Sequence, residues 1–264
     1  NQVVPYLRFG SEEPEGIGSL LRGLVRKHVD CVLQDPYANS FQFQVEDIHC
    51  NPDSWLVDNT TKLVNGKRVN AMSLYVHQRK FEMDSLCSVL RLGRLYFDAT
   101  NESAIFDEKW EQAMELILET FEAMQRPLTP DNFTQVPYTF QTQTSEPKDT
   151  MAHGIGRPGR YTGMIRTGFL PSDDSLRLPY HIPGNAMAVV ELRGLANMLT
   201  EMKRNESLSR RALNLADEID RGIREHGVVT HSISGKRVFA QLVDGFGNFI
   251  FADDANLPSL LSLP

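Results

Sequence analysis

Two adjacent aspartates, Asp173 and Asp174, lie in the proline-rich stretch GFLPSDDSLRLPYHIPGNAMA at residues 168–188. The stretch continues into a helical pattern, so these acids would lie where a helix begins and backbone amides stabilise negative charge. Carboxyl groups held there are suited to general acid or base catalysis. The alternative is a simple capping loop, in which Ser172 and Asp173 accept hydrogen bonds from the first amides of the helix.

Two further acid pairs, Glu82 with Asp84 and Asp253 with Asp254, stand among amides and aromatic residues elsewhere in the chain. Such acids suit either a metal site with oxygen ligands or a sugar site in which carboxyl groups hydrolyse a glycosidic bond. The sequence has no calcium-loop spacing and no His-x-x-x-His pair, which disfavours the metal site. Sugar hydrolysis needs no cofactor, and we predict none.

Other catalytic classes have weak support in the sequence. The glycine-rich pieces at residues 154–159 and 245–248 lack the strand-then-helix context of a nucleotide-binding loop. No G-x-S-x-G motif for a serine hydrolase occurs, and the scattered histidines form no paired motif. We therefore interpret the histidines as surface or packing residues.

Helices must position the acids, and apolar residues at helical spacing predict five of them. The turn QDPYANSF after the first helix presents Asp35, Tyr37 and Asn39, and hairpin turns are predicted at residues 65–67 and at Asp244-Gly245. A last helix should begin at Asn256 as its N-cap. The helices are predicted at residues 15–33, 81–97, 107–126, 183–203 and 208–225.

Helical hairpins in series indicate a solenoid or a closed barrel of helix pairs. No fixed-period repeat occurs, so we favour the barrel, in which loops at one rim would bring the three acid pairs together. The long connection at residues 127–161 is predicted to be a functional loop or a patch of irregular strands.

The 264 residues carry a net charge of −7, which argues against nucleic-acid binding through a broad basic surface. No apolar run is long enough to cross a bilayer. The three cysteines, Cys31, Cys50 and Cys87, are best interpreted as reduced core residues. Four Asn-x-Ser/Thr triplets weakly favour the secretory pathway or an extracellular location, namely those at Asn59, Asn101, Asn132 and Asn205.

Five ordered blocks run along almost the whole chain, namely QDPYANSF, RKFEMDSLCSVLRL, TGMIRTGFLPSDD, YHIPGNAMAVVEL and VDGFGNFIFADDANLPSLLSLP. Together they resemble glycoside hydrolase family 125, the exo-acting, metal-independent α-1,6-mannosidases. This resemblance implies an all-α fold with an (α/α)6 barrel, inversion at the anomeric carbon, no metal, and a mannose-containing oligosaccharide or N-glycan fragment as substrate. His77-Gln78 departs from the Trp-Glu expected there, which puts the role of that position in doubt.

The resemblance also implies roles for particular residues. The general acid would be Asp173 or Asp174, with Asp174 favoured, and the general base would be a glutamate beyond Pro264. We expect residues 1–264 to form a single catalytic domain truncated at both ends, with small β-hairpins in the rim loops. Substrate-binding roles are implied for Glu82, Asp84, Arg79, Arg166, Asp253, Asp254 and Asn256, and a weaker one for Asp244.

Each of these residues has a structural alternative. Arg79 could pair with Asp84, and Asp253 or Asp254 could merely begin the final helix. The alternatives to an exo-mannosidase are a non-catalytic mannoside-binding or inactive barrel fragment and a different (α/α)6 glycosidase.

Overall fold

A computed structural model describes residues 2–42, 61–64, 67–70, 75–129, 136–140 and 146–262. The five helices predicted from apolar periodicity are all present, with ends that differ by a few residues. The helices are α1 (Ile17–Gln34), α2 (Met83–Thr100), α3 (Glu108–Met124), α4 (Ile182–Glu201) and α5 (Glu206–Gly222).

Local signals set where the helices begin. The Asp107 side chain accepts a hydrogen bond from the amide of Trp110 at 3.0 Å, and Asn205 does the same for Leu208 at the start of α5. Both are N-caps, which satisfy amides that have no partner within the helix. At its other end α5 continues into a π-helical turn, η5 (Ile223–Gly227).

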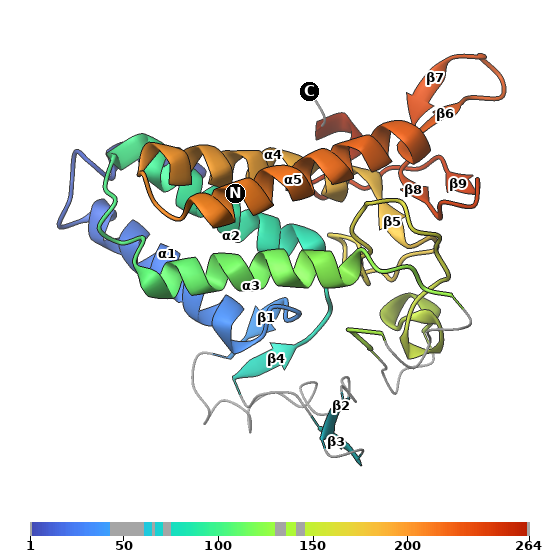
Figure 1. The fold of residues 1–264 in the computed structure, drawn as a ribbon, viewed down its shortest axis with the longest axis horizontal. Coiled ribbons are helices and arrows are strands. Elements are labelled where there is room, and N and C mark those ends of the chain that lie inside the picture. The colour runs from blue at the N-terminus through green and yellow to red at the C-terminus, as the bar shows by residue number, and fades with distance from the viewer. Residues whose placement is uncertain are drawn as a thin grey trace.

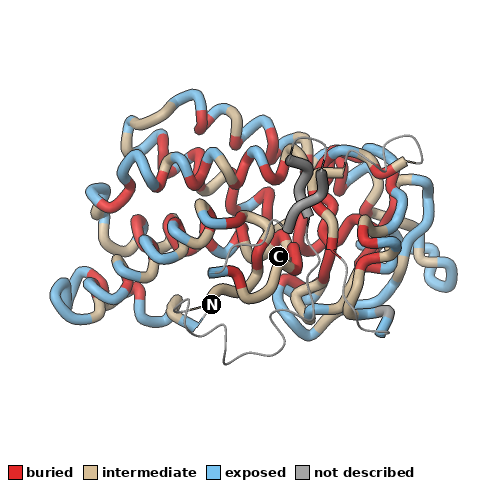
Figure 2. The backbone as a smooth tube through the Cα atoms, turned by 90° about the horizontal axis from the view of Figure 1, so that it is seen from below, coloured by how far each residue is buried: buried red, intermediate tan, exposed pale blue. Residues whose placement is uncertain are grey.

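The helices form layers around a common apolar core. In Figure 1, α4 and α5 lie along one side of the helical body and α1 and α3 along the other, with α2 between them. Buried positions follow the faces where helices meet, and exposed positions follow the outer faces (Figure 2). The molecule is thus a helical fold whose elements pack pairwise.

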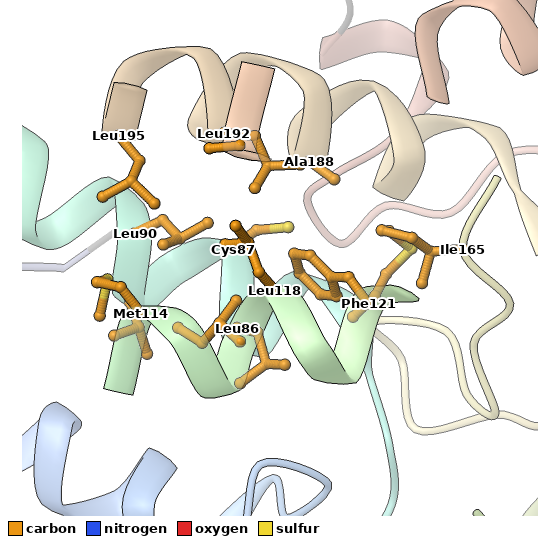
Figure 3. Packing of buried hydrophobic residues seen from close by; sticks show 14 of the residues in the cluster. Leu86, Cys87, Leu90, Met114, Leu118, Phe121, Ile165, Ala188, Leu192 and Leu195 are labelled. Atoms are coloured by element: carbon orange, nitrogen blue, oxygen red, sulfur yellow. The ribbon is translucent and has the colours of Figure 1, made fainter. Parts of the chain in front are cut away.

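The core between α2, α3 and α4 contains almost only apolar side chains (Figure 3). Leu118 and Phe121 of α3 and Leu192 of α4 have no exposed surface. Burying each such side chain contributes roughly 1.5–3 kcal/mol to folding. One close approach requires glycine: a Cβ on Gly222 of α5 would lie 2.2 Å from the carbonyl oxygen of Thr162.

Short antiparallel strands decorate the loops, as the resemblance implied. The hairpin predicted at residues 65–67 is confirmed by the pairing of β2 with β3, although residues 65 and 66 lie outside the described part. The pairs are β1 (Ser40–Phe41) with β4 (Val76–Gln78), β2 (Thr61–Val64) with β3 (Lys67–Asn70), β6 (Val228–Thr230) with β7 (Arg237–Phe239), and the three-stranded sheet of β5 (Tyr180–His181), β8 (Leu242–Val243) and β9 (Phe249–Ile250).

The hairpin predicted at Asp244-Gly245 is also confirmed, between β8 and β9. The Asp244 carboxylate accepts hydrogen bonds from the amides of Phe246 and Asn248 and from the Asn248 side chain. These bonds hold the turn together, so Asp244 shapes this loop.

The helix predicted to begin at Asn256 is wrong. Asn256 donates from its backbone and side-chain nitrogens to Asp254 Oδ1, at 2.9 and 3.1 Å, so it is a donor there instead of the acceptor that a cap requires. Only a 3-10 turn, η6 (Leu260–Ser262), follows within the described residues. The long connection at residues 127–161 contains, in its described parts, 3-10 turns and an isolated bridge between Leu128 and Gly159.

Two remaining predictions concern the thiols and the membrane. Cys31 and Cys87 are free thiols, while Cys50 lies outside the described residues. In the part of the chain that the structure describes, no helix combines the length and apolar character needed to span a membrane.

Candidate active site

The loop that carries Asp173 and Asp174 is tied to the segment that begins α2. The amides of Gly168 and Phe169 donate to the carbonyl of Phe81 at 3.0 and 3.2 Å. The Thr167 hydroxyl donates to the same carbonyl and accepts from the amide of Met83. These contacts place the loop beside Glu82 and Asp84, at the end of the helical body where β5, β8 and β9 also lie (Figure 1).

A tight turn sets the direction of the two aspartates. The amide of Asp173 donates to the carbonyl of Leu170, and the amide of Leu170 donates to the carbonyl of Asp174. Asp173 has a φ of +67°, a left-handed conformation that aspartate tolerates better than most residues. Its side chain is 59% exposed, whereas Asp174 is half-buried. Within the described residues the Asp174 carboxylate has no hydrogen bond or ion pair.

The side chain of Asn39 connects three segments of the site. Its Nδ2 lies 3.3 Å from Gln78 Oε1, 3.3 Å from Glu82 Oε1 and 3.4 Å from Asp173 Oδ1. Its Oδ1 accepts a hydrogen bond from the amide of Lys80 at 3.1 Å. Asn39 therefore holds the two carboxyl groups of Glu82 and Asp173 side by side.

The surroundings of Glu82 favour its neutral form. Burial raises the pKa of Glu82 to about 8, and the negative charges of Asp84 and Asp173 act in the same direction. Lys80 supplies positive charge to Asp173. Its Nζ lies 3.7 Å from Asp173 Oδ1 and donates a hydrogen bond to the backbone carbonyl of Asp173 at 3.0 Å. Glu82 therefore favours the neutral carboxylic acid at neutral pH, which is the form that acid catalysis requires.

The third acid pair meets the other two through Asp254. Burial raises the pKa of Asp84 to about 6, and the charge of Asp254 adds to this shift. Partial burial acts to raise the pKa of Asp254, but hydrogen bonds from Ser172 and Asn256 outweigh it, so that this pKa lies below its ordinary value. Two electrostatic interactions, of Glu82 with Asp173 and of Asp84 with Asp254, therefore connect the three pairs.

His181 lies beneath this group at the start of α4. It is 1% exposed, and burial lowers its pKa to about 4 although Asp254 and Asp253 oppose the shift. Its imidazole is therefore neutral near pH 7. The prediction of a packing histidine fits this position.

Asp253 engages the final turn of the described chain. Its carboxylate accepts hydrogen bonds from the amides of Leu260 at 2.8 Å and Leu261 at 3.3 Å. Asp253 therefore has the structural role considered as an alternative, because its carboxylate caps the last helical turn. Asp254, which accepts hydrogen bonds from Asn256, is the member of this segment that interacts with Asp84 and Ser172.

The two arginines predicted to bind substrate, Arg79 and Arg166, bond to groups outside the three acid pairs. Arg79 forms a salt bridge with Asp35, and its guanidinium lies over the rings of Tyr37 and Tyr138, at 4.9 and 5.5 Å from the ring centroids. The alternative pairing of Arg79 with Asp84 is therefore wrong. The guanidinium of Arg166 is buried and donates to a backbone carbonyl at 2.9 Å. Neither arginine bonds to the three acid pairs within the described residues.

Three residues of the site were not among the predicted site residues: Asn39, Lys80 and Ser172. Asn39 was predicted to be presented by its turn, but nothing in the sequence pointed to its bonds with residues 40 or more positions away. Lys80, with a side chain only 7% exposed, carries no distinguishing pattern. Among the described residues, no three His, Cys, Asp or Glu side chains converge as a metal site.

Comparisons with known proteins identify the family to which the chain is similar. The family model for metal-independent alpha-mannosidase (GH125) matches residues 1–264. The Meiotically up-regulated gene 157 protein of Schizosaccharomyces pombe is 37% identical over 270 residues, covering 100% of this chain and 51% of that protein. The chain thus spans about half the length of this relative.

A solved structure of a metal-independent alpha mannosidase from Streptococcus pneumoniae, in a non-productive substrate complex with alpha-1,6-mannobiose, is also similar. The two structures superpose with a TM-score of 0.84 at 32% identity, over 98% of this chain and 57% of that one.

Proposed function

The chain belongs to the metal-independent α-mannosidases of glycoside hydrolase family 125, and on this premise we propose that it carries the general acid of an inverting exo-α-mannosidase. The substrate would be a terminal α-1,6-linked mannose on a mannose-containing oligosaccharide or N-glycan fragment. One observation carries the proposal above all others: Asn39 holds the carboxyl group of Glu82 beside that of Asp173, which lies on the loop that the resemblance marks as catalytic.

The proposed linkage is supported by the similar Streptococcus pneumoniae structure, which was solved with alpha-1,6-mannobiose. The proposed (α/α)6 barrel is supported by the pairwise packing of α1 to α5 and by the likeness to that enzyme. The remaining helices and the general base would come from outside residues 1–264, because this chain covers 57% of the similar structure.

The proposed reaction is a single displacement. The acid on the Ser172-Asp173-Asp174 loop gives its proton to the glycosidic oxygen, which leaves with the electron pair of the bond to the anomeric carbon. Water adds to that carbon from the opposite face and loses a proton to a carboxylate base. Inverting enzymes hold acid and base roughly 6.5–9.5 Å apart so that this water fits between them.

The other acids have binding roles in this proposal. Carboxylates accept hydrogen bonds from sugar hydroxyl groups, and Glu82, Asp84 and Asp254 face the same space as Asp173. Asn256 and Asp253 would contribute from the last described segment. Arg79 and Arg166 would support the walls of the pocket from behind.

The test is the release of mannose from α-1,6-mannobiose by the whole protein, followed by NMR to identify the anomer formed first. We expect β-mannose first, and a rate lower by roughly 10²–10⁴-fold in the variant carrying both Asp173→Asn and Asp174→Asn. Asp217→Asn, which changes an exposed aspartate on α5, is the matched control and should keep the wild-type rate.

Undiminished release by the double variant would overturn the assignment of the acid. Binding of mannobiose without any release by the wild-type protein would instead identify a mannoside-binding protein. Release from other disaccharides but not from this one would indicate a different glycosidase.

A further inference from the structure

The orientation of the Asn39 amide is fixed by a backbone donor. Because the Lys80 amide donates to Oδ1, the nitrogen Nδ2 must be the atom that faces Gln78, Glu82 and Asp173. This nitrogen carries two hydrogens, and three oxygen atoms lie within 3.4 Å of it. One oxygen is therefore left without a hydrogen from Asn39. A proton held between the two carboxyl groups would supply the missing hydrogen.

The charges around the pair point the same way. Asp84 and Asp254 add negative charge from α2 and from the last described segment, and buried His181 is neutral near pH 7. Among the residues that the structure describes, Lys80 is the cation in contact with the pair, and it lies against Asp173, not Glu82. One positive charge cannot balance two ionised carboxylates beside further acids. The burial that raises the pKa of Glu82 to about 8 agrees with a retained proton.

We infer that Glu82 and Asp173 share one proton at neutral pH, and that Asp173 is the member that delivers it to the leaving oxygen. The inference rests on the proposed function and assigns the acid within it. Glu82 is a positioning residue, because it acts through Asp173. Among the described residues, Asp174 has no hydrogen bond or ion pair at its carboxylate, whereas Asp173 lies within reach of Asn39 and Lys80.

The proposed transfer is balanced. Before the reaction, one of the two carboxyl groups is neutral and the other is ionised. The O–H bond of Asp173 breaks as its proton joins the glycosidic oxygen, and both carboxyl groups are then ionised. Their repulsion favours proton release, and Lys80 compensates part of the charge that develops on Asp173. The carboxylate base takes one proton from the attacking water, so the total charge of the site is unchanged. After product release the base gives this proton to the solvent, and the Glu82–Asp173 pair takes one up.

The first measurement is the pH dependence of kcat on α-1,6-mannobiose for the whole protein. Wild-type activity should decline on the alkaline side as the shared proton is lost. In Glu82→Gln, Asp173 loses its proton more readily, so this decline should move down by at least one pH unit. Glu191→Gln, which removes a buried carboxyl group in the helical body, should leave the profile where it is.

The single aspartate variants separate the two candidate acids. Asp173→Asn should abolish the alkaline decline together with most of the rate, whereas in Asp174→Asn the alkaline decline should stay at the wild-type pH, whatever the rate of that variant. The inference is overturned if Glu82→Gln leaves the profile unmoved, or if Asp174→Asn is the variant that loses it.

A second measurement does not depend on catalysis. The carbonyl stretch of neutral carboxylic acids, followed by infrared difference spectroscopy against pH, should show one group that stays neutral at pH 7 and is missing in Glu82→Gln. In Asp173→Asn its titration should move down by at least one pH unit, and in Asp174→Asn it should not move.

The two proposals then fail separately. Titration as expected with no mannose release would leave the shared proton standing and remove the proposed function. Mannose release with no neutral carboxyl group at pH 7 would do the reverse.

Discussion

Two buried glutamates show how differently the helical body and the rim treat charge. In the body, Glu191 of α4 has a side chain 4% exposed and lies against Arg94 of α2, with Oε2 3.0 Å from the guanidinium. At the rim, Glu82 faces Asp173 and Asp84, and its carboxyl group accepts hydrogen bonds from the neutral side chains of Asn39 and Ser85. In the helical body a buried negative charge is paired with a positive one, whereas at the rim several acidic groups lie close together.

This difference in charge separates the helical body, which stabilises the fold, from the rim, which we propose to carry the function. Like charges held together cost free energy of folding, and such arrangements persist mainly where the chemistry needs a shifted pKa. The rim can hold them because its loops are fixed from behind by neutral and apolar contacts, such as the bonds of Thr167 with Phe81 and Met83. Four experiments test this division, from the largest expected effect to the smallest.

The largest effect is expected at the ion pair that supports the rim. Asp35→Asn would leave the Arg79 guanidinium uncompensated at a site where both side chains are nearly buried, 10% and 12% exposed. We expect the free energy of unfolding to fall by about 3–5 kcal/mol, measured by denaturant titration.

Its matched control is Asp30→Asn, which breaks an exposed pair with Lys109 and should cost at most about 1 kcal/mol. Equal losses in the two variants would show that the Arg79 pair does not anchor the rim.

The next effect concerns the body alone. Leu118→Ala removes a fully buried side chain from the core and should lower the free energy of unfolding by about 2–5 kcal/mol. The rate of mannose release per folded molecule should stay within about twofold, because no rim contact changes.

Leu20→Ala, at a leucine 75% exposed on α1, is the control and should change stability by less than about 0.5 kcal/mol. A Leu118→Ala protein that is stable but inactive would contradict the independence of body and rim.

Two asparagines sharpen the comparison further. Asn39→Ala and Asn185→Ala each remove an amide with several partners and should each cost about 1–3 kcal/mol of stability. Asn185 bonds to backbone groups of Ile165 and His181, so its loss should leave the pH profile of activity unchanged. Asn39→Ala should shift that profile, because Glu82 and Asp173 lose their common donor. Identical profiles in both variants would make Asn39 a purely structural residue.

The smallest effect is a difference in the pH dependence of stability. Glu82 has a folded pKa of about 8 and an ordinary value of 4.5. Between these values the unfolded chain releases the proton and the folded chain keeps it, so rising pH favours unfolding. The stability of Glu82→Gln relative to wild type should therefore increase between pH 4.5 and 8 by at least about 1.4 kcal/mol, the equivalent of one pKa unit.

Thermal unfolding at several pH values measures this difference. Below pH 4.5 the difference should be constant, because Glu82 is protonated in both states. A Glu82→Gln protein whose relative stability falls as the pH rises would show that Glu82 is held as a carboxylate, as an ordinary buried ion pair would hold it.

Much of the helical fold could be predicted from the sequence. The apolar spacing placed all five helices, and the turn residues placed both hairpins, because helical and turn preferences act over a few neighbouring residues. The same local reasoning failed at Asn256. There Asn256 donates its hydrogen bonds to Asp254, so it does not act as the acceptor that an N-cap requires.

The candidate site divides in the same way. The sequence identified the acid pairs, and a resemblance along the chain assigned them to a family, but local patterns could not say which acids meet. Glu82 interacts with Asp173, which is 91 positions further along the chain. Arg79 forms its ion pair with Asp35, although Asp84 is closer in the sequence. Such partners depend on which distant segments the helices bring to one end of the molecule. The sequence by itself thus determined the elements and the candidate residues, whereas the tertiary structure decided the charge around each one, because electrostatic interactions depend on distance in space.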